Sequence, residues 1–184
     1  LKQTPRAIDY LKKRGLTGAI AARYGIGYAP EGWSPLKQVF ADYTADALAA
    51  SGLVVDGDNR RYDRFRDRIM FPIKNIKGQI VGFGGRVLDK GEPKYLNSPE
   101  TPLFHKGSEL YGLFEARAAI KAAGRAIVVE GYMDVVALAQ HGVEFAVAAL
   151  GTATTPIHVR TLLRHTERLI YAFDGDNAGR KAAW

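Results

Sequence analysis

Short apolar runs alternate with helix-like segments from residue 124 onward, and this alternation restricts the fold more than any other feature. The runs AIVV (126–129), FAVAAL (145–150) and RLIYAF (168–173) are typical of buried strands. They are followed by the helix-like segments YMDVVALAQ, TPIHVRTLLR and NAGRKAAW. Strands that alternate with helices form parallel sheets that helices cover on both faces. The sequence therefore predicts an α/β fold with a parallel βαβαβα unit over residues 124–184.

Carboxylates follow two of these runs directly. Glu130 comes after AIVV, and Asp174 and Asp176 come after RLIYAF with Gly175 between them. The carboxyl ends of parallel strands line one edge of the sheet, where ligands bind in open α/β folds. Carboxylates that lie close together raise one another's pKa, so a site that keeps several ionised needs a cation. Because oxygen ligands suit Mg²⁺ or Mn²⁺, the pattern predicts such an ion at this edge.

Composition excludes several other kinds of site. The sequence has no cysteine and only four scattered histidines, so we expect no zinc within this chain. No apolar run reaches the roughly 18 residues that a membrane span needs. The first residues, LKQTPRAIDYLKKRG, lack the apolar segment of a secretory signal. These features predict a cytoplasmic protein without a membrane partner.

Positive charge is concentrated in one part of the chain. The formal charge is +7, and residues 60–94 hold ten Lys/Arg against four Asp/Glu, which gives +6 from that stretch alone. Such a concentration favours a polyanionic partner, most often a nucleic acid. The alternative is a basic face that only contacts water.

Residues 1–123 read as a mixed α+β subdomain. Helix starts at Thr4-Pro5, Thr17 and Ser34-Pro35 predict short helices paired as hairpins over the first fifty residues. From Leu53 to Asn97 the pattern changes to LVV, a DGDN turn, and then MFPIKN and QIVGFGGRVL separated by IKG, which predicts an antiparallel hairpin. The glycines of GFGG indicate a close backbone approach or a bulge. A helix at about 112–123 precedes the boundary that we place near residue 124.

The motifs of the second half, VVEGYMD, ALGT and FDGDNAGR, resemble the TOPRIM fold shared by DnaG-type primases, topoisomerases and some nucleases. The motifs of the first half narrow the choice. YDRFRDRIMFPI, GQIVGFGGRVL, PKYLNSPET and LFHKGSELYGL follow one another as in the amino-terminal part of the catalytic domain of bacterial DNA primases. The resemblance covers nearly the whole chain.

The resemblance implies template-directed synthesis of short RNA primers from nucleoside triphosphates on single-stranded DNA. It places Glu130, Asp174 and Asp176 at the acidic catalytic positions that hold two or more Mg²⁺ or Mn²⁺ ions, and Asp134 at a further metal position. Lys106 matches a catalytic position as well, where a lysine would neutralise triphosphate charge. An alternative for Asp134 is the favourable place of an acid in the first turn of a helix.

The resemblance also implies a set of positions that bind nucleotide or DNA: Arg14, Arg86, Lys94, Tyr95, Asn97 and Lys106. Arginine and lysine neutralise phosphates, Tyr95 offers a stacking face, and Asn97 can bond sugar or phosphate. Structural alternatives remain for three of them. Arg14 could complement the end of its helix, Tyr95 could belong to the core, and Lys106 could be a loop charge.

Two further expectations concern the whole protein. The resemblance implies a fragment of a catalytic core that works at the bacterial replication fork, with a zinc-binding domain and the replicative helicase as partners outside this chain. Two other functions stay open. One is a TOPRIM enzyme that cleaves DNA, and the other is a catalytically silent module that binds single-stranded DNA.

Overall fold

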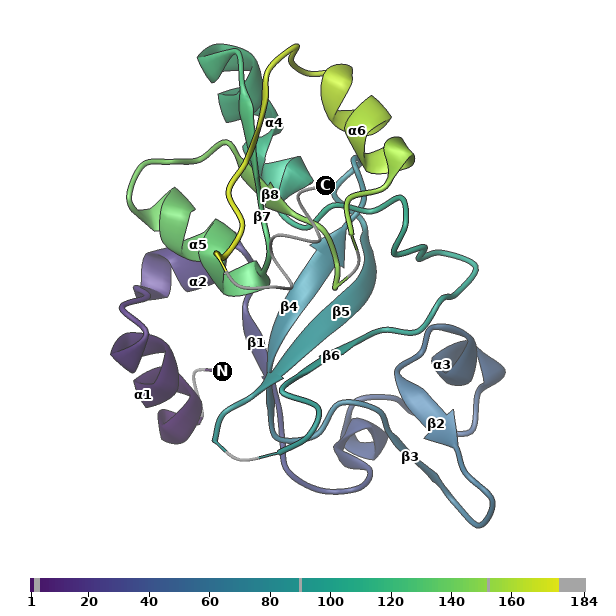
Figure 1. The fold of residues 1–184 in the computed structure, drawn as a ribbon. Coiled ribbons are helices and arrows are strands. Elements are labelled where there is room, and N and C mark those ends of the chain that lie inside the picture. Colours follow the sequence, from purple (N-terminus) through teal and green to yellow (C-terminus); the bar gives the residue numbers. More distant parts are fainter. Residues whose placement is uncertain (2–3, 90, 152, 176–184) are drawn as a thin grey trace.

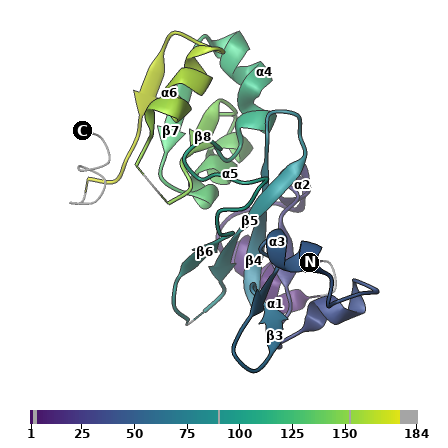
Figure 2. The ribbon, with the colours of Figure 1, turned by 90° about the vertical axis from the view of Figure 1, so that its right-hand side faces the viewer.

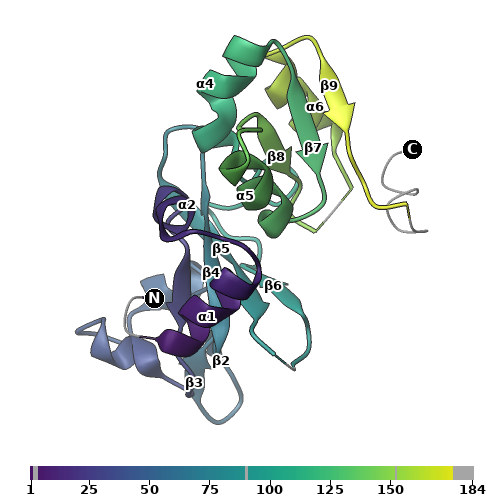
Figure 3. The ribbon, with the colours of Figure 1, turned by 90° about the vertical axis from the view of Figure 1, so that its left-hand side faces the viewer.

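The computed structural model describes residues 1, 4–89, 91–151 and 153–175, and three sheets organise this part of the chain (Figure 1). One is a four-stranded antiparallel sheet in the order β1-β4-β5-β6, one is the pair β2-β3, and one is a parallel sheet in the order β8-β7-β9. Figures 2 and 3 show the parallel-sheet unit at one end of the antiparallel sheet. The mixed α/β fold that the sequence predicts is confirmed.

The first helices form as the sequence predicts. Helix α1 (Pro5–Lys13) begins with proline in its first turn, and the left-handed Gly15 follows its end. Helix α2 (Gly18–Arg23) begins after Thr17, whose hydroxyl accepts a hydrogen bond from the Ile20 N–H at 3.3 Å.

The next segment departs from the prediction of helical hairpins. Residues Gly27–Ala29 form strand β1, which pairs with β4. After Ser34 the chain forms only a 3₁₀ turn, η1 (Pro35–Gln38), before the short helix α3 (Asp46–Ala50). Pairing with a strand forty residues away decides the conformation of β1, and local helix signals do not report it.

The central hairpin carries the glycines. Strand β4 (Arg68–Lys74) pairs with β5 (Ile80–Val87), and β6 (Tyr95–Asn97) adds on the far side of β5. The register shifts between Ile73 and Lys74, opposite Gly82, so a bulge adjoins the glycine run. A Cβ on Gly84 would lie 2.3 Å from Tyr132 Cζ, so this position also meets the expected close approach. Both features that the glycines indicate are present.

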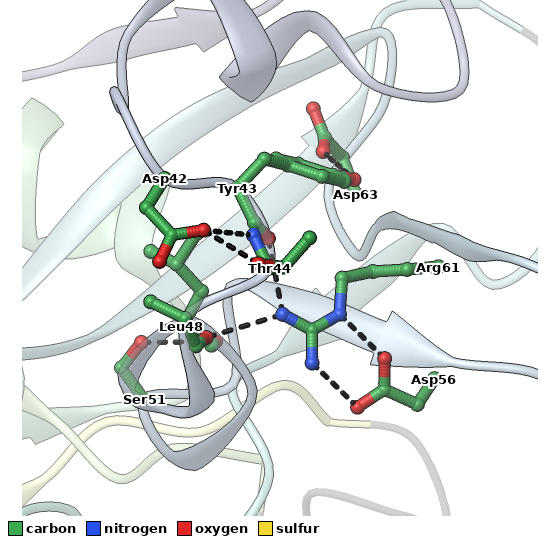
Figure 4. A network of polar contacts seen from close by, with 9 residues as sticks. Asp42, Tyr43, Thr44, Leu48, Ser51, Asp56, Arg61 and Asp63 are labelled. Atoms are coloured by element: carbon green, nitrogen blue, oxygen red, sulfur yellow. Dashed lines mark hydrogen bonds and ion pairs between the residues drawn. The ribbon is translucent and has the colours of Figure 1, made fainter.

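A small polar network holds the β2-β3 hairpin (Val54–Asp56 and Arg61–Asp63) against α3 (Figure 4). Arg61 donates to both carboxylate oxygens of Asp56, at 2.6 and 3.1 Å, and to the carbonyls of Tyr43 and Ala45. The buried Asp63 accepts from the Tyr43 hydroxyl at 2.7 Å. One of the many arginines of this stretch is therefore committed to structure.

The parallel unit comprises α4 (Leu113–Ala123), β7 (Ala126–Val129), α5 (Tyr132–Gln140), β8 (Ala146–Ala148), α6 (Pro156–Leu163) and β9 (Leu169–Tyr171). Alternate residues of the central strand β7 face opposite sides. Val128 packs in a cluster with α4 and α6, whereas Val129 packs in the cluster that contains α5. Helices therefore cover both faces of the sheet, as predicted. The expected last helix, NAGRKAAW, lies outside the described residues.

Strand β9 differs from the buried strand that its sequence predicts. Within the part of the chain that the structure describes it pairs with β7 alone, and Ile170 and Tyr171 are 37% and 41% exposed. An apolar strand at the edge of a sheet has one unpaired side, and its sequence alone does not show this.

One hydrophobic cluster joins α1, α2 and the antiparallel sheet to the parallel unit. It includes Leu11, Phe71, Tyr111, Tyr132 and Val136. The predicted boundary near residue 124 thus crosses a continuous core, and the division into 1–123 and 124–184 stays a prediction. Within the described ranges, no helix has the length and apolar content to cross a membrane.

Candidate nucleotide and nucleic-acid pocket

A pocket of about 620 Å³ lies between the antiparallel sheet and the carboxyl edge of the parallel sheet. Eight predicted site residues line it: Arg14, Arg86, Lys94, Tyr95, Asn97, Glu130, Asp134 and Asp174. We call Arg14, Arg86 and Lys94 the basic wall, and Glu130, Asp134 and Asp174 the acidic edge. The structure brings together residues that are up to 160 positions apart in the sequence.

The acidic edge forms because two parallel strands end side by side. Glu130 follows β7 and Asp174 lies shortly after β9, and the Asp174 N–H donates to Glu130 Oε1 at 2.6 Å. This contact places both residues at the same sheet edge, where the strand pattern predicts them. The third predicted acid, Asp176, lies outside the described residues.

Asp134 joins the edge from the first turn of α5. Its Oδ2 accepts from the Gly131 N–H at 3.0 Å, which caps the helix. The pocket walls reduce its hydration and raise the pKa of Asp134, and the nearby charge of Asp174 raises it further. Asp134 thus has the first-turn position that favours an acid, and its role as a further metal position stays a prediction.

Arg86 is the buried centre of the basic wall. The residue is only 5% exposed, and its guanidinium lies between the rings of Tyr10 and Tyr95, at 5.2 and 5.4 Å from their centroids. Its Nε and Nη1 are buried and have no hydrogen-bond partner among the described residues. Burying a cation and its donors without a partner is costly, and an anion in the pocket would offset this cost.

Arg14 and Lys94 extend the wall toward solvent. Arg14 follows the end of α1 and lies over the ring of Tyr10, and Lys94 precedes β6. Both are exposed, and with Arg86 they also line an adjoining hollow of about 340 Å³. The wall therefore continues beyond the pocket, as a site for an extended polyanion would.

Tyr95 lies at the pocket surface and does not belong to the hydrophobic core. It is 37% exposed, and partial burial raises the pKa of its hydroxyl even though the charge of Arg86 opposes the shift. One face of its ring contacts Arg86, and the exposed part can stack on a base.

Asn97 lines the pocket but its amide has protein partners. Its Oδ1 accepts from the Tyr132 hydroxyl at 2.7 Å, and its Nδ2 donates to the Leu150 carbonyl at 3.0 Å. These bonds join strand β6 to the segments that follow β7 and β8. Sequence reasoning missed the role of Tyr132. The sequence does contain one signal for it, namely a bulky aromatic residue at a helix start together with a run of strand glycines on which such a ring can pack.

Lys106 does not line this pocket. Its N–H donates to Glu100 Oε1 at 3.0 Å, and its carbonyl lies 3.1 Å from Nε2 of the buried His158 in the first turn of α6. Burial lowers the pKa of His158, and its Nδ1 lies 3.2 Å from the Thr155 N–H. The loop is thus fixed to the start of a helix that follows β8, and the catalytic role of Lys106 stays a prediction.

The pocket has a basic wall and an acidic edge, so it suits a ligand that carries both a phosphate chain and a bound cation. A phosphate chain can meet the basic wall while a cation bridges it to the carboxylates. Among the described residues there is no group of three His, Cys, Asp or Glu side chains that is placed to hold a metal ion. Glu130 and Asp174 supply two carboxylates with oxygen donors only, a set that fits Mg²⁺ or Mn²⁺ completed by water and phosphate.

Comparisons with known proteins agree with this geometry. Residues 1–117 match the family model of the DNA primase catalytic core, N-terminal domain, and residues 127–184 match a Toprim-like model. The chain is 64% identical over its whole length to a DNA primase of Neisseria meningitidis, of which it spans 31%.

Solved structures give the same result. A DnaG primase catalytic domain bound to single-stranded DNA has a TM-score of 0.92 and 52% identity, covering 99% of this chain and 59% of that one. A structure of the zinc-binding and RNA polymerase domains of Aquifex aeolicus primase has a TM-score of 0.91 and 37% identity, covering 100% of this chain and 46% of that one. The chain therefore belongs to the family of DNA primase catalytic cores.

Proposed function

We propose that this chain is part of a bacterial primase catalytic core, which synthesises short RNA primers from nucleoside triphosphates on a single-stranded DNA template. The observation that carries the proposal is a pocket lined by the buried Arg86, whose Nε and Nη1 have no partner among the described residues, and by carboxylates at the end of a parallel sheet. The DNA-bound relative supports nucleic acid as the polyanionic partner.

Each wall has a separate task in this proposal. The basic wall binds phosphates of the template or of the incoming nucleotide, and the exposed part of Tyr95 stacks on a base. Binding in this way holds the reacting groups close to the acidic edge, and positioning is, with the neutralisation of charge, what phosphoryl transfer mainly requires.

The acidic edge would hold the metal. TOPRIM domains generally bind divalent metal ions, and we propose that Glu130, Asp174 and Asp176 hold two or more Mg²⁺ or Mn²⁺ ions, with Asp134 in an outer position. When bound, such ions would activate a 3′-hydroxyl and neutralise the charge of the leaving pyrophosphate. The Asp174 N–H keeps Glu130 Oε1 in place, which limits the directions that its carboxylate can take.

Partners and setting follow from the family. The chain spans 31% of the Neisseria primase, and that protein therefore contains further segments outside the match. We propose that a zinc-binding domain, of the kind present in the Aquifex primase, and the replicative helicase act with it at the replication fork in the cytoplasm.

A chimera tests the proposal. This chain would replace the matching segment of the Neisseria meningitidis primase, and labelled nucleotide incorporation on a single-stranded template would be measured with and without Mg²⁺. We expect template- and metal-dependent primers, and their loss in the Asp174→Asn chimera. DNA binding without any incorporation would support the silent binding module, and strand scission would support a cleaving TOPRIM enzyme.

A further inference from the structure

Tyr132 belongs to the parallel unit, but its ring packs against the antiparallel sheet. It is the first residue of α5, two positions after Glu130, and it is only 5% exposed. Its ring stacks on Phe71 of β4, with centroids 5.2 Å apart, and it lies over Gly84 of β5, where an added Cβ would come within 2.3 Å of Cζ. The glycine is what lets the ring reach this position.

Two hydrogen bonds continue from this ring across the pocket. The Tyr132 hydroxyl donates to Asn97 Oδ1 at 2.7 Å, and Asn97 Nδ2 donates to the Leu150 carbonyl at 3.0 Å. Asn97 is also the register partner of Gly84, so the sheet and the tyrosine meet at the same point. We call the set Tyr132, Asn97 and Leu150 the tyrosine clasp.

The clasp joins the two sides of the pocket. Asn97 lies two residues from Tyr95 on β6, which pairs with the strand that carries Arg86. Tyr132 and Leu150 follow the ends of β7 and β8, at the edge that carries Glu130. The Oδ1 and Nδ2 atoms of Asn97 each have a partner in the segments that follow β7 and β8, so the amide links the two sides of the pocket.

We propose that the tyrosine clasp sets the separation between the basic wall and the acidic edge, which makes Tyr132 and Asn97 positioning residues. The inference rests on the proposed function, because only a ligand that touches both walls at once responds to their separation. A metal-bound nucleoside triphosphate is such a ligand. Metal alone needs only the acidic edge, and DNA without metal needs only the basic wall.

The test compares Tyr132→Phe with Tyr111→Phe in this 184-residue chain. Tyr111 is a matched control, because its ring packs on Tyr132 with centroids 4.7 Å apart and its buried hydroxyl has no hydrogen-bond partner among the described residues. Four dissociation constants would be measured for each protein: Mn²⁺ alone, a dT oligonucleotide in EDTA, ATP with Mn²⁺, and ATP without Mn²⁺. The ratio of the two ATP constants measures coupling across the pocket, and formation of Mn·ATP in solution is common to all variants.

We expect Tyr132→Phe to keep the Mn²⁺ and oligonucleotide constants while the coupling ratio falls by about three- to tenfold, the effect of one hydrogen bond. In Tyr111→Phe, all the dissociation constants and the coupling ratio should equal those of the wild type. If Asn97 is instead a direct ligand, Tyr132→Phe frees its Oδ1, and coupling stays equal or rises, which overturns the inference. If the wild type binds neither Mn²⁺ nor DNA, or shows no coupling, the proposed function fails first and the clasp fails with it.

Discussion

Replacing Arg86 by methionine should make the protein more stable and a weaker DNA binder at the same time. Methionine keeps much of the side-chain volume but removes the charge and all five N–H donors. Arg86 is 5% exposed, and its Nε and Nη1 have no partner among the described residues. The free protein therefore carries a cost that a bound anion would reduce.

The stability change follows from two opposing terms. Each unpaired buried donor costs about 1 to 3 kcal/mol. The contacts of the guanidinium with Tyr10 and Tyr95 return about 0.5 to 2 kcal/mol each. The cost of the unpaired donors slightly exceeds the gain from the two ring contacts. Removing the guanidinium should therefore raise the free energy of unfolding by about 1 kcal/mol, or Tm by about 2 to 4 °C for a chain of this length.

DNA binding changes in the opposite direction. Loss of one charge-assisted contact of about 1.5 to 3 kcal/mol weakens binding about 10- to 100-fold. It should also reduce the slope of log K against log salt by about 0.7, the value for one phosphate of a single strand.

Thermal unfolding by circular dichroism and fluorescence anisotropy with a labelled dT oligonucleotide measure the two effects. Anisotropy would be recorded between about 50 and 200 mM salt, where counterion release is readily seen. Lys94→Met is the exposed control, and it should weaken binding without changing Tm. If Arg86→Met lowers both Tm and DNA affinity, Arg86 only supports the fold, and this result would refute the reasoning.

Three further predictions concern other parts of the chain. Gly84→Ala should lower stability by about 1 to 3 kcal/mol through overpacking against the ring that covers it. Gly27→Ala, where an added Cβ finds its nearest neighbour at 3.7 Å, should be almost neutral, and equal thermal midpoints for the two variants would contradict the packing. Burial lowers the pKa of His158, so the folded protein favours the neutral imidazole. The contribution of this imidazole to stability is complete above pH 6.5, the pKa in the unfolded chain, and is lost as the pH falls below that value. The pH dependence of Tm below 6.5 should therefore be shallower in His158→Asn and unchanged in the exposed His141→Gln. Lys106→Ala should reduce nucleotide incorporation by the Neisseria chimera while sparing DNA affinity, and lost DNA binding with normal turnover at saturation would show that Lys106 is a template contact.

The sequence predicts the site better than it predicts the strands around it. Glu130 and Asp174 could be placed at one edge because apolar runs and the carboxylates after them define where parallel strands end. Strand β1 escaped prediction because its conformation depends on pairing with β4. The exposure of Tyr171 also escaped, because an edge strand can have the same composition as a central one.

The side chains of the pocket show a similar limit. The resemblance predicted Arg86 as a phosphate contact, but not that it lies buried between two tyrosines. It also predicted that Asn97 contacts sugar or phosphate, which stays a prediction, but not that its amide contacts Tyr132 and Leu150. Apart from Arg86 and Tyr95, which pair on neighbouring strands, these partners lie more than thirty residues apart, and no local pattern contains them.

Mn²⁺ binding at the acidic edge tests the central claim most directly. Electron paramagnetic resonance of free Mn²⁺ would be titrated with the wild type, with Asp174→Asn, and with Asp42→Asn as a control. Asp42 is an exposed acid whose carboxylate accepts hydrogen bonds from the N–H and the hydroxyl of Thr44, away from the pocket. The account predicts that the wild type and Asp42→Asn bind Mn²⁺ equally and that Asp174→Asn does not bind it while staying folded. Equal Mn²⁺ affinity in all three proteins would contradict the assignment of the acidic edge as a metal site.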